Sequence, residues 1–285
     1  MTRIEEFGWR GMVEPGIGRV VSSHGDYLHL VANEQPAGEI LARLKKSAFL
    51  RMKSVAPTNM KGKKISEIRA EAPPRPLTGD FVRFRFNAQG ESLVTEVLPR
   101  FSHFERKDPT ARRTVQTLAV NFDTLFIMMS LNENFSLKRL ERYLALAGDM
   151  GEAEAVVVLT KCDLGSLPVA RELLPAATVL ISAKTGEGLE QLTPYLRPAH
   201  TVAFIGSSGV GKSTLLNVLA GEEWAATQEI QEWSGKGRHT TTSRELVRLP
   251  SGALVIDTPG VREIGRLGET EELLVKGEST HRYRK

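Results

Sequence analysis

An eight-residue segment, Gly206 to Ser213, has the pattern G-x-x-x-x-G-K-S, which few folds accommodate. This pattern is typical of a loop that wraps backbone N–H groups around the phosphates of a nucleotide. The apolar run 201–205 predicts a buried strand before the loop, and residues 213–220 predict a helix that ends at Gly221. A strand, a glycine-rich turn and a helix in succession predict a parallel α/β domain around a phosphate site.

Three further segments have the composition of a guanine-nucleotide site. Asp257-Thr258-Pro259-Gly260 follows an apolar strand, as the segment that senses metal and γ-phosphate does in GTPases. Thr160-Lys161-Cys162-Asp163 ends in a carboxylate that can accept two hydrogen bonds from the N1–H and N2–H₂ edge of guanine, a pair that adenine does not offer. Ser182-Ala183-Lys184 follows another short strand, where the Ala183 N–H can meet guanine O6.

The order of these segments is rotated. In a Ras-like GTPase the two guanine-reading segments follow the phosphate loop, whereas here both precede it. A complete set in rotated order predicts a circularly permuted GTP hydrolase. Taken alone, the first guanine segment reads equally well as an ordinary loop at a strand end, and Asp257 to Gly260 as a simple turn.

We expect Lys212 to act in catalysis by reaching the β- and γ-phosphates, and Mg²⁺ to be held by the Ser213 hydroxyl and, through water, by Asp257. Val261 stands where a Ras-type enzyme has the glutamine that orients the attacking water, so we expect slow intrinsic turnover. His239 is the predicted catalytic replacement, because a neutral imidazole can orient water; an exposed loop histidine, or one that contacts RNA, is the alternative. The nucleotide-binding residues expected are Thr160, Lys161, Asp163, Ser182, Ala183, Lys184, Gly206, Ser207, Ser208, Gly209, Val210, Gly211, Lys212, Ser213, Thr214, Asp257 and Gly260.

Together with the permuted order, several stretches resemble the RsgA (YjeQ) family of ribosome small-subunit-dependent GTPases. They are Arg238 to Thr242, Asp257 to Gly260, residues 121–135, residues 140–144 and residues 98–100. The resemblance implies an N-terminal OB-fold, a permuted GTPase domain and a role in late maturation of the 30S subunit. It also implies that Thr241 completes the Mg²⁺ shell, although any of the hydroxyls of Thr240 to Thr242 can do so, and that His239 positions water.

We therefore expect a multidomain chain: a small all-β, OB-like barrel followed by an α/β, circularly permuted P-loop GTPase domain. The alternating pattern of Val82, Phe84 and Phe86 predicts one barrel strand, with these three side chains on one face. The expected divisions are residues 1–98 for an RNA-binding barrel, 99–115 for a basic linker, 116–265 for the GTPase domain and 266–285 for a short tail.

Family members normally continue into a zinc module built on three cysteines and one histidine. Cys162 is the single cysteine of this chain, so we expect no zinc site of that kind, whether the module is naturally absent or removed by truncation. A single cysteine also rules out an intramolecular disulfide. With no signal-peptide pattern at the N-terminus and no apolar run near 20 residues, the chain is expected to be a cytoplasmic monomer without membrane contact.

Positive charge is concentrated in one part of the expected barrel. Residues 40–69 contain nine Lys or Arg side chains and one acid, Glu67. Such a stripe is typical of an RNA backbone site, although a solvated basic loop is the alternative. The resemblance implies that the RNA is 16S rRNA of the 30S subunit. Two other functions remain open: a GTP-dependent RNA-binding module with little hydrolysis, and a P-loop ATPase or kinase, against which Asp163 argues.

Overall fold

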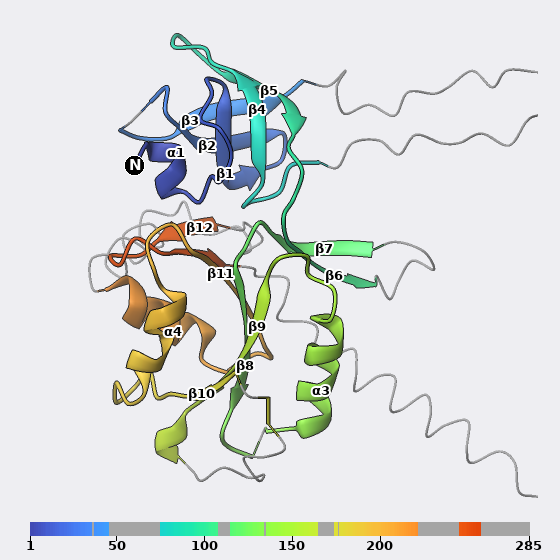
Figure 1. Cartoon of the computed structure of the whole chain (residues 1–285), viewed down its shortest axis with the longest axis vertical. Coiled ribbons are helices and arrows are strands. Elements are labelled where there is room, and N and C mark those ends of the chain that lie inside the picture. The colour runs from blue at the N-terminus through green and yellow to red at the C-terminus, as the bar shows by residue number, and fades with distance from the viewer. Residues whose placement is uncertain are drawn as a thin grey trace, which may run out of the picture.

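The computed structural model describes residues 1–35, 37–45, 75–107, 115–133, 135–164, 174–175, 177–221 and 245–257. These residues form a small β-barrel and a larger α/β domain, which lie at the top and bottom of Figure 1. A four-residue helix, α1 (Arg3–Glu6), precedes the barrel. Among the residues described, no helix combines the length and the apolar composition needed to cross a bilayer.

Five strands form the barrel: β1 (Ile17–His24), β2 (Tyr27–Ala32), β3 (Ile40–Leu44), β4 (Phe81–Arg85) and β5 (Ser92–Val97). They pair in the order β1-β2-β3-β5-β4, and a further pairing of β4 with β1 closes the barrel. Only β3 and β5 are parallel within this ring. A closed five-stranded ring of this order is an OB-type barrel, so the predicted fold of this domain is confirmed.

The predicted pattern of β4 is correct at two of its three apolar positions. Val82 and Phe84 are buried in the barrel core, but Phe86 is 41% exposed. The strand ends at Arg85, and the chain then turns at Asn87, whose side-chain oxygen accepts a hydrogen bond from the Gln89 amide. Phe86 therefore no longer follows the two-residue alternation that a strand imposes.

The α/β domain is a mixed sheet in the spatial order β10-β9-β8-β11-β13-β12. The first five strands of this order are mutually parallel, and β12 is antiparallel at the side of β13. Its strands are β8 (Thr124–Ser130), β9 (Glu154–Thr160), β10 (Thr178–Leu180), β11 (Thr201–Ile205), β12 (Glu245–Arg248) and β13 (Leu254–Asp257). The chain runs outward from β8 to β10 and then returns to place β11 on the other side of β8. This reversal is a switch point, where α/β sheets bind ligands beyond the carboxyl ends of their strands.

Both faces of this sheet are covered, which explains its continuous apolar strands. In Figure 1, helix α3 (Leu137–Leu146) lies on one side of β8 and β9, and helix α4 (Lys212–Ala220) lies on the other. All seven residues of β8 are buried, with Ile127 in the cluster that includes α3 residues and Met128 in the cluster that includes α4 residues. The predicted N-cap of α3 is confirmed, because the Ser136 hydroxyl accepts a hydrogen bond from the Arg139 amide.

The stretch 99–115, expected as a linker, is partly a hairpin strand. Strand β6 (His103–Lys107) pairs antiparallel with β7 (Val115–Val120), and Phe104 is fully buried in the core of the α/β domain. Composition misled the prediction, because basic side chains dominate this stretch, whereas burial of Phe104 in a distant core anchors the strand. The tail expected at 266–285 lies outside the described residues.

Candidate functional site

The phosphate loop has the backbone shape that its sequence requires. It leaves β11 at Gly206 and enters α4 at Gly211, where φ is 154° and 100° respectively. A Cβ atom on Gly206 would lie 2.6 Å from the Met128 carbonyl oxygen, so a larger residue does not fit there. Helix α4 then begins directly after the loop, so its N-terminus faces the loop in the arrangement that binds anions.

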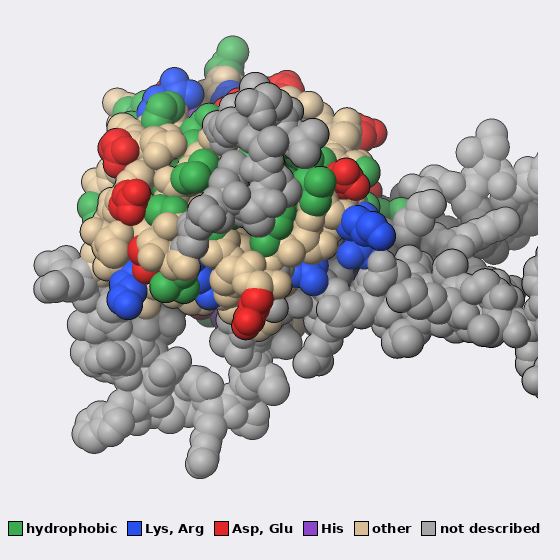
Figure 2. Space-filling view, turned by 90° about the horizontal axis from the view of Figure 1, so that it is seen from below, with side chains coloured by type: hydrophobic (Ala, Val, Ile, Leu, Met, Phe, Trp, Pro, Cys, Tyr) green, Lys and Arg blue, Asp and Glu red, His purple; other side chains and the backbone are tan. Residues whose placement is uncertain are grey.

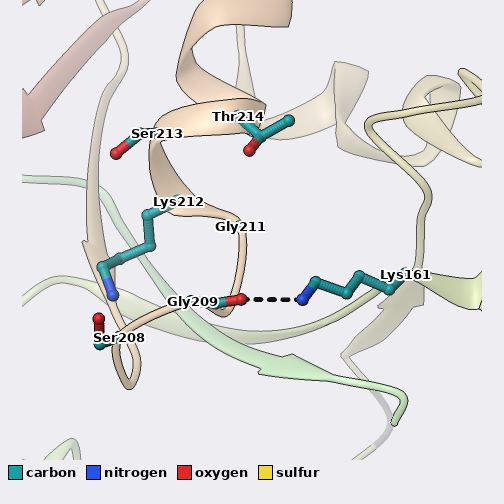
Figure 3. A pocket seen from close by; sticks show the side chains of 7 residues that line it. All are labelled: Lys161, Ser208, Gly209, Gly211, Lys212, Ser213 and Thr214. Carbon is teal, nitrogen blue, oxygen red and sulfur yellow. Dashed lines mark hydrogen bonds between the residues drawn. The ribbon is translucent and has the colours of Figure 1, made fainter.

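Two lysine ammonium groups lie against carbonyl oxygens of this loop. Lys212 Nζ donates to the carbonyls of Gly206 at 2.6 Å and Ser207 at 2.8 Å. Lys161, from the end of β9, donates to the Gly209 carbonyl at 2.9 Å, as the dashed line in Figure 3 shows. These side chains border a cavity of about 410 Å³, whose lining residues are Lys161, Ser208, Gly209, Gly211, Lys212, Ser213 and Thr214.

Thr160 stands where the guanine-reading segment of GTPases usually begins with Asn. It is the last residue of β9 and is buried, and its hydroxyl donates to the Val210 carbonyl of the phosphate loop at 2.6 Å. The shorter side chain therefore still reaches the loop. Asp163, three residues on, lies in the short helix η1 (Cys162–Leu164) and is exposed at the surface.

The second guanine-reading segment is a tight turn after β10. The Ser182 side chain is buried and accepts a hydrogen bond from the Thr185 amide, and the Gly186 amide donates to the Ser182 carbonyl. The turn ends at Gly188, where a Cβ atom would lie 2.1 Å from the Leu180 carbonyl oxygen. Sequence reasoning did not single out Gly188; its signal is the glycine just before helix η3 (Leu189–Tyr195), whose N-cap it forms with φ of 73°.

Hydrogen bonds bring the two guanine-reading segments together. The Cys162 amide donates to the Ile181 carbonyl at 3.2 Å. Burial raises the pKa of the Cys162 thiol, and the nearby Glu187 carboxylate raises it further. Cys162 is therefore a neutral contact between the two loops at physiological pH. Ala183 and Lys184, next to Ser182, lie at the same edge of the sheet.

The remaining predicted residues divide between the described and undescribed parts of the chain. Asp257 is the last residue of β13, which pairs with β11, so its backbone lies one strand from the phosphate loop. His239, Thr241 and Gly260 lie outside the described residues. The structure thus brings the carboxyl ends of β9, β10, β11 and β13 to one edge of one sheet, as the rotated set of motifs requires.

Residues 97–267 match the sequence model of the family described as RsgA GTPase. The chain belongs to the RsgA GTPase family. A protein of Lactiplantibacillus plantarum named small ribosomal subunit biogenesis GTPase RsgA 2 is 40% identical over 254 residues, which cover 87% of this chain and 66% of that protein. The small ribosomal subunit biogenesis GTPase RsgA of Opitutus terrae is 43% identical over 216 residues, which cover 70% of this chain and 59% of that protein. The chain thus spans less than two thirds of the length of either RsgA relative.

Two solved structures have the same fold. The crystal structure of YjeQ from Thermotoga maritima is 25% identical with a TM-score of 0.55, and the match covers 85% of this chain and 74% of that one. YloQ, described as a circularly permuted GTPase, is 21% identical with a TM-score of 0.51, covering 85% of this chain and 70% of that one. The predicted fold class, an OB-like barrel followed by a permuted GTPase domain of the RsgA type, is confirmed.

Proposed function

We propose that this protein binds and hydrolyses GTP and that it couples this cycle to the 30S ribosomal subunit late in its maturation. The observation that carries the proposal is that β9, β10, β11 and β13, the strands that lead into the four predicted nucleotide-binding segments, all end at one edge of one sheet. Family membership and the names of the RsgA relatives support it. In this proposal residues 116–265 hydrolyse GTP, and residues 1–98 bind 16S rRNA.

The base and the phosphates are held by different parts of the site. Asp163 accepts hydrogen bonds from the guanine edge, and the stem of Lys161 lies along the base. Backbone N–H groups of the loop from Gly206 to Gly211 surround the phosphates. Lys212 exchanges its two carbonyl partners for the β- and γ-phosphate oxygens, a stronger, charge-assisted contact.

The residues that are expected to hold Mg²⁺ suit this ion. The Ser213 side chain is exposed in the first turn of α4, beside the cavity, and Asp257 ends the neighbouring strand. Hydroxyl and carboxylate oxygens are ligands that Mg²⁺ prefers, and Thr241 is proposed as a third. When bound, the ion neutralises negative charge on the phosphate oxygens.

The chain itself must position the attacking water. Val261 offers no hydrogen bond, so we assign this role to His239, whose neutral imidazole can accept a proton from water or orient it. The Gly260 amide is proposed to contact the γ-phosphate. In this proposal both GTP and the partner are needed for rapid turnover, so turnover without the partner is slow.

Contacts with rRNA are assigned to the basic stretch 40–69. The end of the molecule opposite the barrel is seen in Figure 2, where acidic, basic and apolar side chains are interspersed over the described residues. Such a mixture is unlike the single-sign stripe of an RNA backbone site. In this proposal the protein acts as a monomer in the cytoplasm, where 30S subunits are assembled.

The test compares GTP hydrolysis by the purified chain alone, with 30S subunits and with 50S subunits, under single-turnover conditions. We expect stimulation by 30S subunits only, and His239→Ala should bind GTP normally but lose most of this stimulation. Binding to 30S subunits without stimulated hydrolysis would favour the GTP-dependent RNA-binding module instead.

The nucleotide class is tested with Asp163→Asn. The amide presents a donor where the carboxylate accepted, so the variant should lose GTP affinity and gain affinity for xanthosine triphosphate, which has an oxygen at that position. ATP should not compete with GTP for the wild-type protein. Competition by ATP at equal concentration would support the ATPase or kinase function and refute guanine recognition.

A further inference from the structure

Strand β1 of the barrel is also a neighbour of the nucleotide-binding sheet. One edge of β1 pairs with β2; the other pairs with β4 from Ile17 to Arg19 and then with β12 at Ser22. Ser22 lies opposite Glu245 of β12, and Glu245 lies opposite Asp257 of β13. A backbone ladder therefore runs from the barrel to the strand that ends at the proposed magnesium residue.

Successive side chains of β1 serve the two domains in turn. Val20 is fully buried in the barrel core, together with Leu30 and Val82. Val21 is 5% exposed and belongs instead to the core cluster of the α/β domain, which includes Leu246 of β12 and Ile256 of β13. Because successive side chains of a strand point to opposite faces, β1 contributes side chains to both cores.

A second link joins β1 to the strand that leads into the phosphate loop. The guanidinium of Arg19 is fully buried and donates to the Thr201 hydroxyl at 2.9 Å and to the carbonyls of Phe7 and Asn121, each at 2.6 Å. Thr201 is the first residue of β11. Because a buried guanidinium needs all its partners, these contacts hold β1 firmly against the α/β domain.

We propose that β1 is a positioning element of the nucleotide site, through which the state of the nucleotide and the state of the barrel are energetically coupled. This inference rests on the proposed function, and it adds a structural connection between nucleotide binding by the α/β domain and RNA binding by the barrel. Strand β12 has four residues and depends on β1 and β13 for its backbone pairing. A shift of Asp257 on loss of the γ-phosphate therefore changes the strain on Ser22, and by linkage a ligand on the barrel biases Asp257 to the same extent.

The test is hydrogen exchange of the full chain, measured with GDP and with a non-hydrolysable GTP analogue, each with Mg²⁺. Peptides covering 206–213 report on nucleotide binding, and peptides covering 17–24 report on β1. In the wild-type protein we expect exchange in 17–24 to slow roughly fivefold or more with the analogue relative to GDP, the lower limit of typical couplings.

Val21→Ala and Val20→Ala form a matched pair, because each removes the same two methyl groups from a buried position of one strand. In Val21→Ala, exchange of 17–24 should no longer slow with the GTP analogue, while 206–213 stays protected by nucleotide. In Val20→Ala, both effects should remain. If an alanine variant does not fold, Val21→Thr and Val20→Thr replace the pair with the same expected results, since threonine has nearly the volume of valine and adds the same hydroxyl at each buried position.

The outcomes distinguish a failure of the proposed coupling from a failure of the proposed function. A wild-type protein with protection at 206–213 but no change at 17–24 overturns the coupling and leaves nucleotide binding intact. The coupling is equally overturned if Val21→Ala keeps the response, or if Val20→Ala loses it to the same degree. Absence of protection at 206–213 with either nucleotide refutes the proposed function, and the coupling with it.

Discussion

The hydroxyl of Thr160 donates a hydrogen bond to the carbonyl of Val210, at 2.6 Å, and so ties the first guanine-reading segment to the phosphate loop. The next residue, Lys161, contacts the neighbouring carbonyl of Gly209. Two consecutive residues at the end of β9 therefore hold the loop from one side. These contacts connect the proposed base site directly to the phosphate loop.

Thr160→Val should weaken binding of GDP. The variant keeps the shape of the side chain but leaves the buried Val210 carbonyl without its donor, at a cost of about 1–3 kcal/mol. We expect a loss of affinity of roughly tenfold, measured by titration with a fluorescent GDP analogue. Thr160→Ser retains the hydroxyl and should bind nearly as the wild type does; an equal loss in both variants would contradict a role for the hydrogen bond.

Gly188→Ala should damage the second guanine-reading turn far more than Gly186→Ala. Both glycines have positive φ, 73° and 83°, so both substitutions add backbone strain of about 1–2 kcal/mol. Only at Gly188 would the new Cβ atom overlap a backbone carbonyl, whereas at Gly186 it would meet nothing within 4 Å. GTP affinity and the thermal midpoint should both fall further for Gly188→Ala. Similar values for the two variants would show that the overlap is relieved by a local shift.

Arg19→Ala should destabilise the whole chain. Burial lowers the pKa of the Arg19 guanidinium to about 9, with Asp123 and Asp80 opposing the shift, so the group is still charged at neutral pH. Its removal leaves several buried carbonyls without donors, and we expect a loss of about 3–5 kcal/mol in the free energy of unfolding, measured in urea by tryptophan fluorescence. Arg43, 60% exposed and paired with Glu91, is the control; Arg43→Ala should cost under about 1 kcal/mol.

His200 should make stability depend on pH in the weakly acidic range. Burial lowers the pKa of His200 below its ordinary value of 6.5, with Asp123 opposing this and Arg197 adding to it. The unfolded chain then binds the proton more readily, so stability falls as the pH drops below about 6.5 and levels off below the folded-state pKa. His200→Gln should lack this part of the dependence in urea unfolding at a series of pH values, whereas a variant of the exposed His24, His24→Gln, should retain it.

Sequence patterns predicted the local parts of the nucleotide site well. The strand 201–205 and the helix that stops at Gly221 were both predicted, because the apolar run and the glycines act over a few residues. The hairpin strand β6 was missed, because its identity depends on Phe104 packing into a distant core rather than on local composition. Periodicity alone does not fix the order of the barrel strands; the resemblance implied the OB topology, and the parallel pairing of β3 with β5 confirms it.

The chemical groups expected at the nucleotide site follow from the amino-acid sequence, since each motif contains its donors and carboxylates within a few consecutive residues. How the two domains meet depends on long-range contacts. Arg19 gives no sequence signal of burial, and the pairing of Ser22 with Glu245 joins residues far apart in the chain. The physical reason is that a strand's neighbours, and the partners of a buried charge, are selected by long-range packing, which no local pattern encodes.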